Sequence, residues 1–157
     1  EIISCNVIVF YKKRDLSKVK KKKNPVVAHT YMGNDVKNKN VLIVDDMIAS
    51  GGSVLEVAKE LREKGANKIN IICTFALFTE GIEKFKDAYE QNWFDALYTT
   101  NLSYIPDEYT SLEWFNVADL SEMVAKVIDR LDTKQPLSEF LDGRKDMFHK
   151  IQTGMKK

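Results

Sequence analysis

Short apolar runs and longer stretches with helical spacing follow one another along this chain. The run Val41, Leu42, Ile43 and Val44 has the length and branching of a buried parallel strand. Further strands are predicted at residues 6–10, 69–74, 97–99 and 114–117. Helices are predicted at residues 53–64, 81–92 and 120–131, with a short closing helix at residues 136–141. This alternation predicts an α/β fold with a mostly parallel central sheet, flanked by helices on both faces.

The first predicted helix has the clearest signals at its ends. Its apolar side chains recur on one face, at Val54, Val57, Ala58 and Leu61. Ser53 with Glu56 forms a capping-box pattern at its start, and Gly65 suits its C-terminal cap. Asp119 with Glu122 repeats the capping-box pattern before the last long helix. Glu60 and Lys64 are spaced as a favourable pair, four residues apart.

Two carboxylates and a run of small residues connect the strand at residues 41–44 to this helix. Asp45 and Asp46 are expected at the carboxyl end of the strand, where open α/β sheets place their ligands. After Ala49 the loop consists of Ser50, Gly51, Gly52 and Ser53. Such a loop can turn sharply and bring N–H groups and hydroxyls to a phosphate at a helix N-terminus. The pattern predicts a ribose-phosphate pocket, although an ordinary tight turn between strand and helix has similar residues.

The segment from Val44 to Ser53 resembles the phosphoribosyl-diphosphate loop of ribose-phosphate diphosphokinases. Further segments resemble parts of that family in the same order, over about residues 6–142: residues 10–15, 73–78, 99–101 and 117–121. The resemblance implies a type I phosphoribosyltransferase-like fold. It also implies transfer of diphosphate from ATP to ribose 5-phosphate, giving phosphoribosyl diphosphate and AMP in nucleotide biosynthesis, with Mg²⁺ as cofactor.

The resemblance also assigns roles to residues of this chain. Lys12 and Arg14 fall on the family's catalytic lysine and arginine. Phosphoryl transfer depends on neutralising charge on phosphate oxygens, which an ammonium and a guanidinium on one loop can do together. The ribose 5-phosphate site is assigned to Asp45, Asp46, Ala49, Ser50, Gly51, Gly52 and Ser53. Without the neighbouring match, Lys12 and Arg14 read as the start of a solvated basic loop at residues 15–24.

The chain departs from the family pattern in three ways. Ala49 stands where many members have a ribose-contacting aspartate, and Phe75 stands where relatives often have histidine. The amino-terminal domain, with its metal-binding histidine and the pyrophosphate loop, is missing ahead of the catalytic loop. Residues 1–142 are therefore expected to be a carboxyl-terminal domain, followed by a basic tail at residues 143–157. We expect no metal ligands in this part, no activity in isolation, and a homo-oligomer, dimer or hexamer, for the full-length enzyme.

Composition narrows the function classes further. The 157 residues are 44% hydrophobic and 30% charged, as in ordinary globular domains, and the net charge of +1 argues against a nucleic-acid binder. No apolar run reaches transmembrane length, so no membrane partner is expected. Cys5 and Cys73 have no disulfide or metal spacing, which indicates a reducing compartment and a cytoplasmic protein. His29 and His149 lack neighbouring ligands at metal-binding spacing.

Two alternative functions remain compatible with the residues. One is a receiver-type signalling domain, in which the acidic pair Asp45 and Asp46 holds Mg²⁺. Such a domain needs an aspartate at the end of a later strand, and the strand at residues 69–74 ends in Thr74 and Phe75. The other is a non-catalytic homologue that associates with active diphosphokinase subunits and regulates them. Ala49 is compatible with that role, whereas the retention of Lys12 and Arg14 argues against it.

Overall fold

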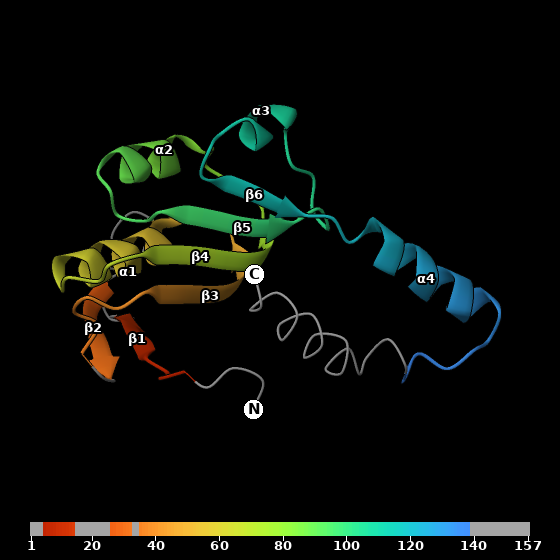
Figure 1. Ribbon diagram of the computed structural model, residues 1–157, viewed down its shortest axis with the longest axis horizontal. Coiled ribbons are helices and arrows are strands. Elements are labelled where there is room, and N and C mark those ends of the chain that lie inside the picture. Colours follow the sequence, from red (N-terminus) through yellow and green to blue (C-terminus); the bar gives the residue numbers. More distant parts are fainter. Residues whose placement is uncertain (1–4, 15–25, 33–34, 139–157) are drawn as a thin grey trace, which may run out of the picture.

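The computed structural model describes residues 5–14, 26–32 and 35–138, with side chains at residues 5–9 and 35–138. Four parallel strands form the main sheet in the order β3-β4-β5-β6 (Figure 1): β3 (Val41–Ile48), β4 (Ile69–Ala76), β5 (Ala96–Thr100) and β6 (Phe115–Ala118). The helices are α1 (Gly52–Glu63), α2 (Glu83–Glu90), α3 (Asp107–Thr110) and α4 (Ser121–Asp132). The predicted mostly parallel α/β sheet with helices is confirmed, but the predicted helix layer on the second face is not seen in the described residues, where that face stays exposed.

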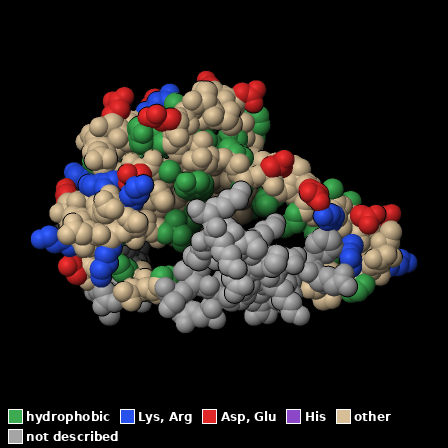
Figure 2. All heavy atoms as spheres, in the orientation of Figure 1, with side chains coloured by type: hydrophobic (Ala, Val, Ile, Leu, Met, Phe, Trp, Pro, Cys, Tyr) green, Lys and Arg blue, Asp and Glu red, His purple; other side chains and the backbone are tan. Residues whose placement is uncertain are grey.

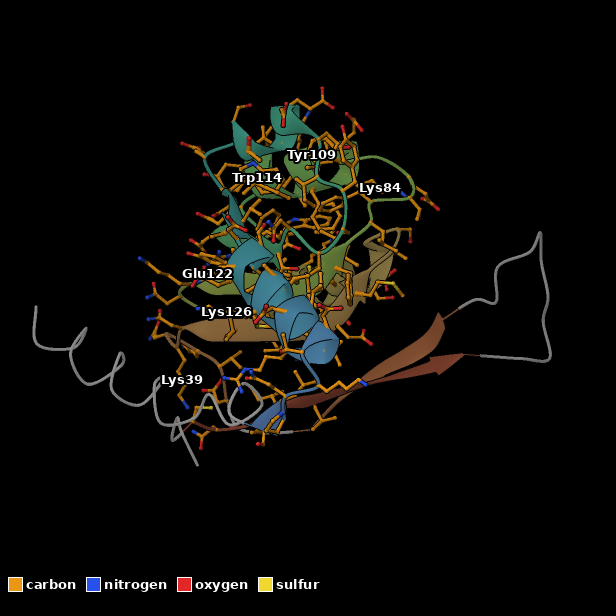
Figure 3. The ribbon with its side chains drawn as sticks, turned by 90° about the vertical axis from the view of Figure 1, so that its right-hand side faces the viewer. Lys39, Lys84, Tyr109, Trp114, Glu122 and Lys126 are labelled. Carbon is orange, nitrogen blue, oxygen red and sulfur yellow. The ribbon has the colours of Figure 1, made fainter. Side chains whose placement is uncertain are left out.

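A separate antiparallel hairpin precedes this sheet. It consists of β1 (Val9–Arg14) and β2 (Val26–Met32), with Lys12 opposite His29 and a bulge at Arg14. The predicted strand at residues 6–10 is therefore displaced toward the basic residues, and β2 was missed. The basic residues were predicted to form a loop, because the sequence of this hairpin lacks the alternation of apolar and polar residues that identifies a strand. In Figure 1 the hairpin lies beyond β3, and Figure 3 shows it extending away from the parallel sheet.

The hydrophobic core lies on one face of the parallel sheet. Ile69, Ile71 and Leu97 point to this face and are 0% exposed. α1 covers them with Val54, Leu55, Ala58 and Leu61, and α2 contributes Phe85 and Ala88. The remaining space is filled by aromatic rings, with Phe78, Phe94, Trp114 and Phe115 buried and in contact with one another or with rings beside them. Figure 3 places Tyr109 and Trp114 at the α3 end of this aromatic cluster.

The opposite face of the sheet carries large apolar side chains that the described part of the chain leaves exposed. Val44 pairs with Ile72 and Ile72 with Tyr98, so these side chains share one face, together with Leu42. Their exposed fractions are 73%, 39%, 41% and 56% for Val44, Ile72, Tyr98 and Leu42. Hydrophobic side chains are visible over the middle of these strands in Figure 2. The core of the described domain is therefore one-sided.

The capping box predicted at Ser53 is wrong in position, whereas the one predicted at Asp119 is confirmed in part, because Oδ1 of Asp119 accepts the N–H of Ser121 at 2.8 Å. α1 begins one residue early, with Gly51 as N-cap and no side-chain cap, and Ser53 lies inside the helix. Leu120 is the N-cap of α4, and Asp119 lies just outside the helix. The glycine turn itself starts α1, so Ser53 is left in the first turn. At the other end of α1 the predictions are confirmed, because Gly65 has a positive φ of 83° after the cap and Lys64 lies 3.6 Å from Glu60.

The last helix, α4, has no buried residue in the described structure. Its apolar stripe includes Ile128 and Leu131, each 61% exposed. Lys126 pairs with Glu122 one turn earlier on the same helix, and both are labelled in Figure 3. No helix in the described ranges is long and apolar enough to cross a membrane.

Candidate functional site

The acidic pair lies inside β3, not after it. β3 continues to Ile48, and Asp45 pairs with Cys73 of β4. Because successive side chains of a strand point to opposite faces, Asp45 and Asp46 diverge. Asp45 is half-buried on the core side, Asp46 is exposed, and the N–H of Asp46 donates to Oδ1 of Asp45 at 3.0 Å. The two carboxylates therefore flank the strand from both sides.

The loop at residues 49–53, named the phosphate loop below, joins β3 to α1. Gly51 adopts φ 79° and ψ −11°, a left-handed conformation that glycine adopts without strain. The first helical hydrogen bond is donated by the N–H of Leu55 to the carbonyl of Gly51, at 3.0 Å. The N–H groups of Gly52 and Val54 therefore have no acceptor within the helix. The partial positive charge of the N-terminus of α1 lies at this loop and favours binding of a phosphate there.

A shallow hollow of ≈ 310 Å³ lies beside Asp45, at the carboxyl ends of the strands. It opens on the exposed apolar face of the sheet, because its wall includes Val44, Ile72 and Tyr98 as well as Cys73, Thr74, Thr99 and Thr100. Burial raises the pKa of the Cys73 thiol, the hydrogen bond to the Thr99 hydroxyl opposes this, and the carboxylate of Asp45 adds to the increase. The thiol therefore stays protonated at neutral pH and acts here as a small apolar group.

The neighbouring strand ends meet in a hydrogen-bonded cluster at the same edge of the sheet. Asn101 donates from Nδ2 to Oδ1 of Asp119 at 2.6 Å and to Oγ of Ser121 at 2.9 Å. Its Oδ1 accepts the N–H of Leu120 at 2.8 Å. The N–H of Ser121 also donates to Oδ1 of Asp119, at 2.8 Å. Hydrogen bonds from Ser121 contribute most to lowering the pKa of Asp119, and the bond from Asn101 adds to this. These bonds fix the start of α4 to the end of β5.

Lys12 and Arg14 lie on the backbone of β1, opposite β2. Their side chains lie outside the described part of the structure, as do residues 15–25, residues 139–141 of the predicted closing helix and the basic tail. The catalytic role of Lys12 and Arg14 therefore stays a prediction. The division into residues 1–142 and 143–157 likewise stays a prediction.

Known families contain this combination of loop, acidic strand and helix. Residues 2–98 match the phosphoribosyl transferase domain family. The chain belongs to this family. It is 40% identical over 96 residues to the ribose-phosphate pyrophosphokinase of Mycoplasma genitalium, covering 60% of this chain and 28% of that protein. The enzyme of the same name from Mycoplasmopsis pulmonis is 30% identical over 149 residues, covering 92% of this chain and 44% of that protein.

A solved structure agrees with this family assignment at the level of fold. The crystal structure of phosphoribosylpyrophosphate synthetase from Mycobacterium smegmatis superposes with a TM-score of 0.56 and 23% identity, covering 73% of this chain and 35% of that chain. The predicted resemblance to ribose-phosphate diphosphokinases is confirmed by these relatives. The chain spans less than half the length of the two pyrophosphokinases. Family membership also sets aside the receiver-type hypothesis.

Sequence reasoning missed the residues that support the phosphate loop from behind. The N–H groups of Leu77 and Thr79 donate to the carbonyls of Ile48 and Ala49, each at 2.9 Å. The ring of Phe85 lies against Gly51. The residues at 73–78 were recognised as a family-like strand end, but no pattern in the sequence indicated that this strand end binds the neighbouring loop.

Proposed function

We propose that this chain forms the ribose 5-phosphate-binding part of a ribose-phosphate diphosphokinase, which transfers diphosphate from ATP to ribose 5-phosphate. The observation that supports this most strongly is the left-handed Gly51 between an acidic strand and a helix N-terminus, in a chain of the phosphoribosyl transferase domain family. Relatives named ribose-phosphate pyrophosphokinase favour the diphosphokinase over other members of that family. Homo-oligomeric assembly and a cytoplasmic location stay predictions.

The proposed site divides substrate recognition between the loop and the strand. The phosphate monoester accepts hydrogen bonds from the N–H groups of Gly51 and Gly52 at the start of α1 and from the Ser50 hydroxyl. Asp46, the more exposed carboxylate, accepts hydrogen bonds from ribose hydroxyls. Asp45, on the opposite face of β3, is assigned to the site on the basis of the resemblance. Ala49 offers no carboxylate, so these two side chains supply the negative charge on the sugar side of the site.

The transferred diphosphate needs positive charge, since charge spreads over its oxygens during transfer. We assign this to Lys12 and Arg14, on the basis of the resemblance. Magnesium, when bound, neutralises phosphate oxygens. The described residues contain no group of three His, Cys, Asp or Glu side chains that could hold a metal.

Calorimetry with ribose 5-phosphate tests the binding half of the proposal. We expect ribose 5-phosphate to bind, and ribose without its phosphate to bind at least tenfold more weakly, because loss of a charged hydrogen-bonded group costs about 1.5–3 kcal/mol. Ser50→Ala and Asp46→Ala should weaken binding, whereas Asp107→Ala at the start of α3 is a remote control. If Ser50→Ala, Asp45→Ala and Asp46→Ala all bind as tightly as the unaltered chain, the site assignment is wrong.

Complementation tests the catalytic half. The chain, supplied to a diphosphokinase from which the corresponding part has been removed, is expected to restore release of AMP from ATP and ribose 5-phosphate. Lys12→Ala and Arg14→Ala should abolish that restoration without changing calorimetric binding of ribose 5-phosphate. Binding without restored AMP release would favour the regulatory homologue instead.

A further inference from the structure

The phosphate loop is held in place by residues 77–85, the support segment, which consists of the loop after β4 and the first turn of α2. The N–H of Leu77 donates to the carbonyl of Ile48, the last residue of β3, and the N–H of Thr79 donates to the carbonyl of Ala49 in the loop, each at 2.9 Å. These bonds fix the two residues that immediately precede Ser50. The position of the phosphate loop therefore depends on the shape of the support segment.

The residue between the two donors has an unusual backbone. Phe78 adopts φ 42°, in the left-handed region, where a bulky side chain is strained. Its ring is 6% exposed and packs edge-on against Phe85 and Tyr109, at centroid distances of 4.9 and 5.7 Å. A glycine here would relieve the backbone but would lose these ring contacts. The buried ring of Phe78 thus keeps the support segment in the turn that points both N–H groups at β3 and its loop.

The second contact is between Phe85 and Gly51. Phe85 lies on α2 and is 0% exposed. A Cβ atom on Gly51 would lie 2.2 Å from Cε2 and 2.4 Å from Cζ of that ring. The ring therefore fills the space directly behind Gly51, at the residue whose left-handed backbone starts α1. By contrast, a Cβ atom on the neighbouring Gly52 would meet nothing within 4 Å.

We propose that Phe78 and Phe85 are positioning residues for the phosphate loop: packed against each other, they hold Gly51 and the carbonyls of Ile48 and Ala49 so that the loop amides face a phosphate. Neither ring contacts the substrate. This inference rests on the proposed function, because it assumes that the loop binds the phosphate of ribose 5-phosphate. It places the determinants of phosphate affinity partly on α2, away from the loop itself.

Phe85→Leu tests the proposal, with Phe94→Leu as matched control. Phe94 is equally buried at 0% exposure and its ring centroid lies 6.3 Å from that of Phe85, but the atoms nearest a Cβ on Gly51 all belong to Phe85. Urea unfolding is expected to show a similar loss of stability for both variants. At a temperature where both are folded, calorimetry should show about tenfold weaker binding of ribose 5-phosphate for Phe85→Leu only, because small displacements of binding groups are costly. Equal affinities for both variants would overturn the proposal.

A double variant separates positioning from general loosening of the core. In Gly51→Ala the new methyl group meets the Phe85 ring, and Phe85→Leu removes that ring. We therefore expect Gly51→Ala with Phe85→Leu to bind ribose 5-phosphate more tightly than Gly51→Ala alone. If the loss of affinity in the double variant equals the sum of the losses in the two single variants, direct contact between Gly51 and Phe85 is contradicted.

A readout without ligand distinguishes this inference from the proposed function. Hydrogen exchange at the amides of Leu77 and Thr79 should speed up several-fold in Phe78→Leu and Phe85→Leu, and stay unchanged in Phe94→Leu. If the unaltered chain does not bind ribose 5-phosphate, the proposed function is wrong. Independently of binding, unchanged exchange at both amides in Phe78→Leu and Phe85→Leu would overturn the support role of the two rings.

Discussion

Arg62 and Asp95 form an ion pair of 2.7 Å that joins α1 to the start of β5. The same carboxylate oxygen accepts the N–H of Ile69, the first residue of β4, at 2.7 Å. The guanidinium also donates to the carbonyls of Asn92, Ala66 and Asn67. The Arg62 side chain thus links α1 to the loops at the amino-terminal ends of the strands, opposite the candidate site.

Arg62→Lys should lower the free energy of unfolding by about 2 kcal/mol, because a single ammonium cannot reach the acceptors that the planar guanidinium bonds together. Urea unfolding measures this change. Lys64→Ala, which removes an exposed pair with Glu60, is the control and should change stability by less than about 0.5 kcal/mol. Equal stabilities for Arg62→Lys and Lys64→Ala would mean that the Arg62 contacts contribute little.

The two loop glycines should respond differently to alanine. Gly51→Ala is expected to cost about 3 kcal/mol, from the left-handed backbone and the overlap with the Phe85 ring. Gly52→Ala places its methyl group in open space at the first position of α1 and should stabilise the chain by about 0.5 kcal/mol. Thermal unfolding of both variants checks this difference. A Gly51→Ala protein as stable as Gly52→Ala would show that the loop turns differently.

Ile71 and Ile72 are neighbours on β4 that point to opposite faces. Ile71 is 0% exposed and Ile72 is 39% exposed. Ile71→Ala should cost about 3–4 kcal/mol through lost burial and a cavity, whereas Ile72→Ala should cost less than about 1.5 kcal/mol. Chemical denaturation of the two variants measures both values. Reversed magnitudes would mean that the register of β4 is shifted by one residue.

Much of the parallel sheet was predictable because its strands and helices carry apolar periodicity. The helix at residues 53–64 and the strand at residues 69–74 are within two residues of α1 and β4. β2 was not predictable in this way, since His29 and Thr30 interrupt its apolar residues. The extension of β3 through Asp45 and Asp46 was also missed, because carboxylates are rare inside strands.

The site was predictable in its residues but not in its support. Small residues between Ala49 and Val54 indicated the loop directly, since glycine adopts the left-handed backbone of Gly51 without strain. The bonds from Leu77 and Thr79 use backbone donors, which any residue supplies. A positive φ at Phe78 is contrary to the preference of its residue type, so only the packed structure reveals it.

Acid should loosen the junction between β5 and α4. Hydrogen bonds from Ser121 and Asn101 lower the pKa of Asp119 in the folded chain, so its stabilising effect is complete above the ordinary aspartate pKa of about 3.9. That effect is lost as the pH falls through the lowered folded pKa. We expect unaltered protein to be more stable than Asp119→Asn at pH 7, and the difference to shrink progressively below about pH 4. A difference that is independent of pH would contradict the role of the carboxylate.

The two cysteines should differ in reactivity. Cys5 is exposed, whereas Cys73 is buried and burial raises its pKa. At pH 8, iodoacetamide should modify Cys5 rapidly and Cys73 only in denaturant, since the thiolate is the reacting form. Mass spectrometry after timed quenching measures both rates. Fast labelling of Cys73 in the folded chain would show that the sheet opens at β4.

Asp45 and Asp46 point to opposite faces of β3, and this separates the surroundings of the two carboxylates. Adjacent residues of an extended strand cannot grip one ligand atom together, so the pair is not a chelating clamp. Each acid instead acts in its own surroundings, one beside a protonated thiol and one in water. A substitution on one side of the strand should therefore change the surroundings of one carboxylate and leave those of the other unaltered.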